Sequence, residues 1–213
     1  MTLMSEVARS SEQLCACLCP RPPQIVFAAK LLDAAASAHL DGNFERAASL
    51  ISEANFPEIR EWTESLWGPH SQYVRHRMVP DSPPHLPKAE RLPVRMPSLA
   101  ERQWLRARDG LHCRFCGIPL IRKEVRERVR RCYPTIWGRK NVAQHAAFQA
   151  MWLQYDHLLP HARGGNNSLE NLVITCAPYN YARMDFTLAE LGLLDPRDRA
   201  PVRSSWDGLE RFP

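Results

Sequence analysis

The sequence predicts an α+β protein in which a helical N-terminal module precedes a mixed domain of helices and short strands. Three observations lead to this prediction. Apolar residues recur at helical spacing between residues 24 and 67. Six prolines fall within residues 79–97, a composition that excludes both a helix and a central strand. Between residues 153 and 186 the pattern changes to strand, polar loop, strand and helix.

Residues 1–23 show no regular period and end in the proline-rich "PRPP", so a disordered N-terminus is expected. This segment holds three alternating cysteines, Cys15, Cys17 and Cys19. Alternate spacing near a chain end is more often incidental than metal-binding. We therefore assign no site to these cysteines.

Residues 24–78 are expected to form a module of three amphipathic helices. Their apolar stripes begin at Ile25, Phe44 and Ile59 and follow the period of an α-helix. Gly42 is placed to end the first helix. No group of residues in this module suits catalysis, so we expect it to form a homodimer or to bind a protein partner.

The proline-rich residues 79–97 are expected to be an extended linker or strap. The second domain covers residues 98–195, and residues 196–213 form a C-terminal tail. This domain opens at Ser98 and Glu101, which match a capping box for a short helix. A further helix is expected from Asn141 through Leu153.

A basic helix is expected in the middle of this domain. Residues 98–155 hold 12 Lys and Arg against 4 Asp and Glu, a density typical of proteins that bind a polyanion. The apolar stripe of the helix consists of Ile121, Val125, Val129 and Cys132. We expect Arg122, Arg126 and Arg130 on the other faces to follow a nucleic-acid backbone through its phosphates. The alternative is a helix face that contacts only solvent.

No apolar run approaches the roughly 20 residues that a membrane-spanning helix needs, and no stretch resembles a secretory signal. We therefore expect a cytoplasmic protein with no membrane partner. In that compartment the seven cysteines would be thiols or metal ligands and not disulfides.

The stretch "YDHLLPHARGGNNSLENLVITCAPYNYARMD" holds the residues best suited to catalysis. Asp156 and His157 are adjacent at a strand end, where neighbouring side chains point to opposite faces. The loop that begins at Leu158 supplies a bend, Asn171 starts the second strand, and Asn180 lies near the start of the last helix. A carboxylate, an imidazole and an amide oxygen suit a hard divalent cation beside a general base. They do not suit a tight structural zinc.

The order DH, P, RGG, N, NL, C, N, R in this stretch resembles the motif of the HNH endonucleases, also called the ββα-metal or His-Me finger group. The upstream "RDGLHCRFCG" is similar to the first half of the zinc knuckle found in many members. The resemblance covers about residues 101–186. It implies a helical N-terminal module plus a ββα-metal (HNH) nuclease domain with inserted helices.

The resemblance also implies an activity, the metal-dependent hydrolysis of DNA phosphodiester bonds. His157 would be the general base that takes a proton from the attacking water. Asp156 and Asn180 would hold one divalent ion, Mg²⁺ or Mn²⁺, at the scissile phosphate. Asn171 would hold the loop so that the base is aimed correctly.

Arg183 stands where members of the family often have Lys or Arg. Arg183 would contact a phosphate oxygen, and Arg163 would be a weaker candidate of the same kind. His161 either lines the loop or contacts phosphate or metal. Two other functions stay open, a DNA-binding module that has lost cleavage and an RNA-cleaving toxin.

The second half of the zinc knuckle is incomplete. Members close it with Cys-x-x-Cys followed by the catalytic asparagine, but here Tyr179 stands in place of the second cysteine. Cys113, Cys116 and Cys176 would therefore offer three thiolates to a structural zinc, which prefers four ligands. The fourth ligand would be His112, Cys132, a water or none. The alternative is an apolar cluster capped by Tyr179.

Overall fold

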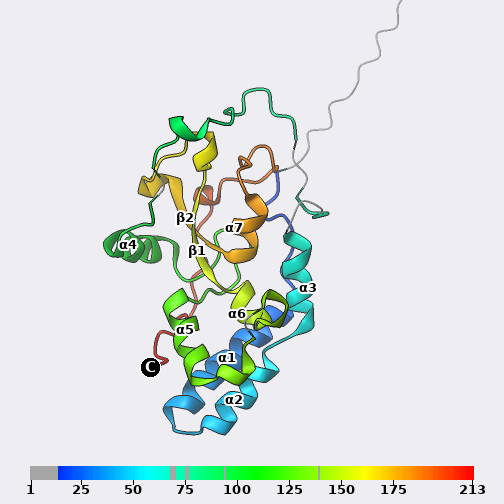
Figure 1. The fold of residues 1–213 in the computed structure, drawn as a ribbon, viewed down its shortest axis with the longest axis vertical. Helices are drawn as coiled ribbons and strands as arrows, with labels where there is room; N and C mark the ends of the chain where they lie inside the picture. Colours follow the sequence, from blue (N-terminus) through cyan, green and yellow to red (C-terminus); the bar gives the residue numbers. More distant parts are fainter. Residues whose placement is uncertain (1–13, 68–70, 75–76, 94, 139) are drawn as a thin grey trace, which may run out of the picture.

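The computed structural model describes residues 14–67, 71–74, 77–93, 95–138 and 140–213 (Figure 1). The α-helices of these residues are α1 (Gln24–Leu40), α2 (Phe44–Glu53), α3 (Pro57–Leu66), α4 (Leu99–Asp109), α5 (Lys123–Cys132), α6 (Ala146–Ala150) and α7 (Ala177–Arg183). The strands are β1 (Leu153–His157) and β2 (Leu172–Cys176). Short 3₁₀ turns occur at Lys88–Glu90, Pro134–Ile136, Asn141–Ala143, His161–Arg163, Leu169–Asn171 and Pro196–Asp198. The α+β class predicted from the sequence is confirmed.

The three helices expected in residues 24–78 are present as α1, α2 and α3. Ile25 and Ile59 are fully buried as predicted, but Phe44, expected to begin the second stripe, is 56% exposed, and α2 instead buries Ala47, Leu50 and Ile51. The Asn43 side chain accepts a hydrogen bond from the Arg46 N–H and so caps α2, at a distance of 3.1 Å. Of these helices, α3 packs against α6 and α7 of the mixed domain.

The predicted capping box is formed at the start of α4. The Glu101 N–H donates to the Ser98 hydroxyl over 3.3 Å, and the Ser98 N–H donates to the Glu101 carboxylate over 2.7 Å. Gly110 follows the helix with φ of 76°, a conformation that glycine adopts without strain.

The prediction of a single helix from Asn141 through Leu153 is wrong. A 3₁₀ turn and the five-residue α6 take its place. The helix is interrupted because His145 has an extended backbone and its ring caps α6. It ends early because the Leu153 N–H donates to the Ile121 carbonyl, which starts β1.

Within the described residues, the sheet consists of β1 and β2 in antiparallel pairing. Asp156 pairs with Val173, and His157 pairs with Leu172. The sheet lies between α4 and α7 (Figure 1), and α7 follows β2 directly. This β–loop–β–helix unit places the end of β1, the long loop and α7 next to one another.

Three segments were expected to lie outside the two domains: residues 1–23, 79–97 and 196–213. Each of them contacts the domains in its described part. Of residues 1–23, those from 14 onward are described, and the Cys15 N–H donates to the Gly192 carbonyl over 2.9 Å. In the proline-rich strap the Leu86 N–H donates to the Ala162 carbonyl over 2.8 Å. In the C-terminal tail the side chain of Phe212 is buried. Residues 1–13, also expected to be disordered, lie outside the described residues.

No helix among the described residues is long and apolar enough to cross a membrane.

Candidate active site and three-cysteine cluster

Asp156 and His157 end strand β1 and face opposite sides of it. Asp156 is 8% exposed, whereas His157 is partly exposed. Burial does not alternate along the whole of β1, but at its last two residues the imidazole faces the loop while the carboxylate faces the interior.

The Asp156 carboxylate is paired with Arg183 of α7. The Arg183 Nη1 lies 2.5 Å from the Asp156 Oδ2. Burial raises the pKa of Asp156, although the charges of Arg183 and His157 act to lower it. A carboxylate has about four lone-pair sites, so one arginine contact leaves acceptor capacity for a metal ion.

Arg183 is fully buried and holds α7 against the end of β1. Its Nη2 donates to the carbonyl of His157 over 3.2 Å and to that of Leu158 over 3.0 Å. Its guanidinium lies 5.1 Å from the centroid of the Phe115 ring. The prediction that Arg183 contacts a phosphate is corrected, because all of its surface is covered by protein.

His157 is oriented by Asn167, a residue that the motif did not identify. The His157 Nε2 lies 3.1 Å from the Asn167 Oδ1, and the Asn167 Nδ2 donates to the Pro93 carbonyl over 3.0 Å. Because the amide oxygen is an acceptor, the histidine proton in the neutral ring is assigned to Nε2 and the free lone pair to Nδ1. The polar "GGNNS" within the loop was the sequence signal for such a partner.

Asn171 closes the loop that joins β1 to β2. Its Oδ1 accepts from the Leu159 N–H over 2.8 Å, and its Nδ2 donates to the carbonyls of Leu159 and Asn166 over 3.1 and 2.9 Å. Gly165 belongs to the same closure, since a Cβ there would lie 1.8 Å from the Leu159 carbonyl oxygen. The loop therefore has a defined path next to His157. The His161 ring also lies along it, 5.8 Å from His157 between ring centroids.

Asn180 lies on α7, which contacts β1, and its side chain is partly exposed. Asp156 and Asn180 thus come from neighbouring elements. Among the described residues, the groups of three or more His, Cys, Asp or Glu side chains able to hold a metal do not include Asp156. A Mg²⁺ ion held by Asp156 and Asn180 stays a prediction.

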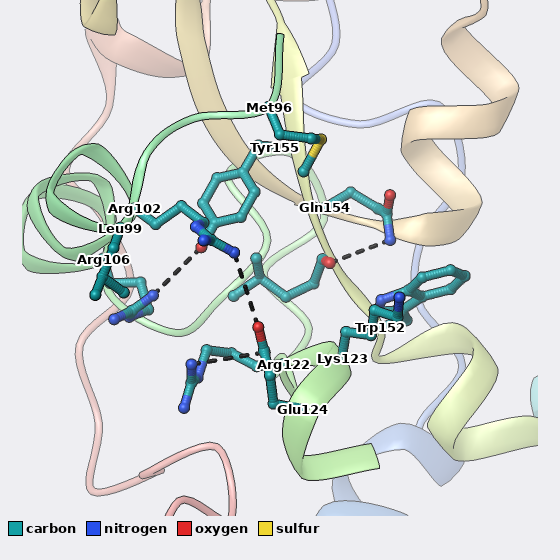
Figure 2. A pocket seen from close by; sticks show the side chains of 11 residues that line it. Met96, Leu99, Arg102, Arg106, Arg122, Lys123, Glu124, Trp152, Gln154 and Tyr155 are labelled. Carbon is teal, nitrogen blue, oxygen red and sulfur yellow. Dashed lines mark hydrogen bonds and ion pairs between the residues drawn. The ribbon is translucent and has the colours of Figure 1, made fainter. Parts of the chain in front are cut away.

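A basic cleft opens along β1 between α4 and α5 (Figure 2). Its cationic residues are Arg102, Arg106, Arg122 and Lys123. The Glu124 Oε1 lies 3.8 Å from the Arg102 Nη1, and the Glu124 Oε2 lies 3.6 Å from the Arg122 Nη1. The Arg106 Nη1 donates a hydrogen bond to the Tyr155 hydroxyl over 3.3 Å. Four cationic side chains and one carboxylate, that of Glu124, line the cleft. This excess of positive charge suits an anionic ligand.

The arginines assigned to the nucleic-acid backbone have different positions. Arg126 is buried, with its guanidinium 4.4 Å from the Trp152 ring centroid, and burial lowers its pKa to about 10. Arg163 is buried and pairs with Glu190 over 2.8 Å. The predictions that Arg126 and Arg163 contact phosphate are corrected, because both side chains are buried and their guanidiniums already contact Trp152 and Glu190.

Arg122 and Arg130 remain accessible to different degrees. Arg122 is partly exposed in the basic cleft and forms an ion pair with Glu210 of the C-terminal tail. Arg130 is exposed on α5. Of the predicted stripe on this helix, Cys132 is exposed and so does not belong to the buried face.

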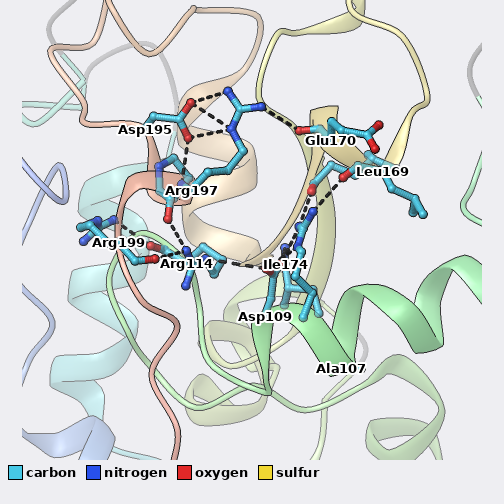
Figure 3. A network of polar contacts seen from close by, with 12 residues as sticks. Ala107, Asp109, Arg114, Leu169, Glu170, Ile174, Asp195, Arg197 and Arg199 are labelled. Atoms are coloured by element: carbon cyan, nitrogen blue, oxygen red, sulfur yellow. Dashed lines mark hydrogen bonds and ion pairs between the residues drawn. The ribbon is translucent and has the colours of Figure 1, made fainter.

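A polar network fixes the other edge of the sheet (Figure 3). The buried Asp109 accepts from the Ile174 N–H of β2 over 3.1 Å and pairs with Arg108 over 2.7 Å. Arg114 donates to the carbonyls of Pro196 and Arg199, which ties the start of the C-terminal tail to the same edge. This edge is occupied by protein, whereas β1 borders the open cleft.

Cys113, Cys116 and Cys176 form a cluster that could hold a metal ion. Their Sγ atoms lie within 4.8 Å of one another, and those of Cys116 and Cys176 are 3.7 Å apart. Two thiolates about 2.3 Å from a tetrahedral zinc would be about 3.8 Å apart. Burial acts to raise the pKa of Cys113, but hydrogen bonds from Cys116, Cys176 and Thr175 bring it well below its ordinary value. Burial raises the pKa of Cys116 and of Cys176 well above the ordinary value, so of the three thiols only Cys113 favours the thiolate form without a metal.

Neither protein residue considered as a fourth ligand belongs to this cluster. The His112 Nε2 lies 3.4 Å from the Ser204 hydroxyl, and Cys132 is exposed on α5. Tyr179 is fully buried; its hydroxyl accepts from the Cys19 N–H and donates to the Cys19 carbonyl, each over 3.0 Å. Tyr179, which stands where a second cysteine was expected, therefore holds the N-terminal segment through the backbone of Cys19.

No protein-family model, curated protein or solved structure matches the chain. The function proposed below therefore depends on the site itself and on the motif in its sequence.

Proposed function

We propose that this protein is a metal-dependent endonuclease of the HNH, or ββα-metal, type that hydrolyses DNA phosphodiester bonds. One observation carries the proposal. His157 stands at the end of β1 with its Nε2 held by Asn167, beside a loop that Asn171 closes with three side-chain hydrogen bonds. This order of residues also matches the motif in the sequence.

His157 acts as the general base. With the Nε2 proton donated to Asn167, the Nδ1 lone pair is free to take a proton from the attacking water. Asn171 acts indirectly, because its bonds to Leu159 and Asn166 determine where the loop runs next to the imidazole. His157 thus transfers the proton, and Asn171 orients the loop beside it.

Asp156 and Asn180 would hold the catalytic divalent ion, Mg²⁺ or Mn²⁺. Their carboxylate and amide oxygens are hard ligands of the kind these ions prefer. When bound, the ion would stabilise the charge that develops on the leaving oxygen. Arg183 keeps the Asp156 carboxylate in place from the interior side.

The test is the conversion of supercoiled plasmid to nicked or linear DNA with Mg²⁺ and without it. Replacing the general base by His157→Ala should lower the rate about 100-fold or more, because positioned bases contribute roughly that factor. His85→Ala is the matched control, since His85 is exposed and pairs only with Asp185 over 3.3 Å among the described contacts. It should cut at the rate of the unaltered protein.

Equal nicking by the unaltered protein and the His157→Ala variant would contradict the mechanism. Plasmid binding without cleavage would favour a DNA-binding module. A parallel reaction with RNA distinguishes the third function, since an RNA-cleaving toxin would cut RNA and leave the plasmid intact.

A further inference from the structure

A second cavity lies between the C-terminal end of α3, the segment 141–152 and α7. Three aromatic and three carboxamide side chains line it: Trp67, Trp152, Tyr181, Asn141, Gln144 and Gln149. None of these side chains is charged. The cavity is therefore chemically different from the basic cleft beside it.

Two polar groups of this cavity lack a partner in the described part of the chain. Gln149 is 7% exposed and lines the cavity; its carboxamide makes no hydrogen bond to any described residue and is not among the fully buried polar groups, so it stays accessible from the cavity. The Trp67 indole N–H is buried and also has no acceptor there. A buried polar group without a partner costs roughly 1–3 kcal/mol. A ligand that accepted a hydrogen bond from the Trp67 indole N–H would remove this cost, and its other polar groups would pair with the accessible Gln149 carboxamide.

The aromatic side chains specify a flat ligand. The rings of Trp67 and Tyr181 meet edge to face, with centroids 5.5 Å apart and planes at 83°. Trp152 is supported by the Arg126 guanidinium, 4.4 Å from its ring centroid. Purines and pyrimidines combine a stacking face with a donor and acceptor edge, and carboxamides are side chains that pair with such edges.

The position of the cavity connects it with the active site. Tyr181 directly follows Asn180 on α7, and Trp152 lines both this cavity and the basic cleft. A strand whose phosphates lie in the cleft would therefore bring a base next to Trp152. Bases of single-stranded or extruded nucleotides are recognised in this manner, by stacking and by hydrogen bonds to the exposed edge.

We propose that the cavity lined by Trp67, Trp152, Tyr181 and Gln149 binds one unstacked nucleobase of the nucleic-acid substrate. The inference rests on the proposed function, because it takes the ligand to be a polynucleotide. It adds a determinant of substrate choice that the phosphate contacts cannot supply, since phosphates are the same in every sequence.

The test compares two fluorescently labelled single-stranded DNA 12-mers by anisotropy, without added divalent cations so that no cleavage occurs. One strand carries normal bases and the other carries central abasic sites with the same phosphates. The unaltered protein should bind the normal strand about 5- to 100-fold more tightly, the range expected for one stacked base. Tyr181→Ala and Gln149→Leu should each bring this ratio close to one while changing the affinity for the abasic strand little.

Trp104→Ala is the control, because Trp104 and Tyr181 are both 46% exposed and Trp104 does not line the cavity. This variant should keep the ratio. An unchanged ratio in both cavity variants would overturn the proposal, and so would a ratio of one in the unaltered protein. Tighter binding of free nucleoside monophosphates than of the 12-mer would also overturn it. Plasmid cleavage with a ratio of one would contradict this inference alone, whereas base-dependent binding without cleavage would contradict the proposed nuclease activity alone.

Discussion

At the scale of single residues, the pairing of Arg183 with Asp156 determines how the candidate site is held. Both side chains are buried, so each charge has lost most of its water and depends on the other. Removing one partner of such a pair leaves an uncompensated charge in the interior. The guanidinium also satisfies the carbonyls of His157 and Leu158, where the strand ends.

The first residue-scale prediction follows from this burial. Arg183→Met should lower the free energy of unfolding, measured with urea, by about 3–5 kcal/mol. Arg130→Met is the control, because Arg130 is exposed and such substitutions change stability by about 0.5 kcal/mol or less. Unchanged stability with weaker DNA binding would instead restore the phosphate role that the burial of Arg183 argues against.

The sequence predicted which residue types gather at the site better than it predicted which of them are buried. Asn171 closes the loop through hydrogen bonds to Leu159, whereas its role in aiming His157 stays a prediction. Arg126 could not be placed from the sequence, because the ring it packs against, Trp152, is on a different element. Helical periodicity separates an apolar stripe from polar faces, but it does not say which polar face a distant element will cover.

At the scale of elements, His145 joins α6 to α2. Its Nε2–H donates to the Ile51 carbonyl over 2.7 Å, and its Nδ1 accepts from the Phe148 N–H over 3.5 Å. The neutral ring therefore has both nitrogens satisfied, and a second proton on Nδ1 would break the cap. Burial lowers the pKa of His145 to about 4.

This depressed pKa predicts a loss of stability in mild acid. Below about pH 6.5 the unfolded chain binds a proton at His145 while the folded chain does not, so the free energy of unfolding falls as the pH drops towards 4. The contribution is up to about 3 kcal/mol. His145→Asn can still cap α6 but does not titrate, so it should remove this part of the pH dependence in urea titrations between pH 7 and 4. Parallel stability curves for the two proteins would contradict the assignment.

The three-cysteine cluster is also a link between elements, since it joins the turn at Cys113 and Cys116 to the end of β2 at Cys176. We predict that protein purified without chelator contains one zinc per chain, measured by elemental analysis. Cys116→Ser should lower the zinc content and the melting temperature, whereas Cys132→Ser, on the exposed side of α5, should leave both unchanged. A protein free of zinc would favour an apolar cluster capped by Tyr179.

At the scale of the whole molecule, segments without a regular pattern complete the core. In the C-terminal tail the Trp206 indole N–H donates to the Leu120 carbonyl over 2.9 Å. The proline-rich strap accepts a hydrogen bond from Arg163 at the carbonyl of Pro83. Proline content and lack of period suggested a linker and a tail, and those signals are correct about local conformation. They carry no information about long-range contacts, which decide domain boundaries.

Phe212 shows how the ends of the chain join the N-terminal helices to the mixed domain. Its ring lies 4.4 Å from that of His39 in α1 and 6.4 Å from that of Tyr133, between centroids. Tyr133 directly follows α5, and its hydroxyl lies 2.7 Å from the His39 Nδ1. One buried cluster therefore includes α1, the C-terminal tail and the residue after α5.

Because the core is shared, the protein should unfold in one step. Far-ultraviolet and near-ultraviolet circular dichroism should give coincident urea transitions, and Phe212→Ala should shift both together by about 3–5 kcal/mol. Val202→Ala is the control, since Val202 is 47% exposed and its loss should move the transition by about 0.5 kcal/mol or less. If the N-terminal helices were instead an independent module, Phe212→Ala would separate the two transitions, with the helical signal persisting after the aromatic signal is lost.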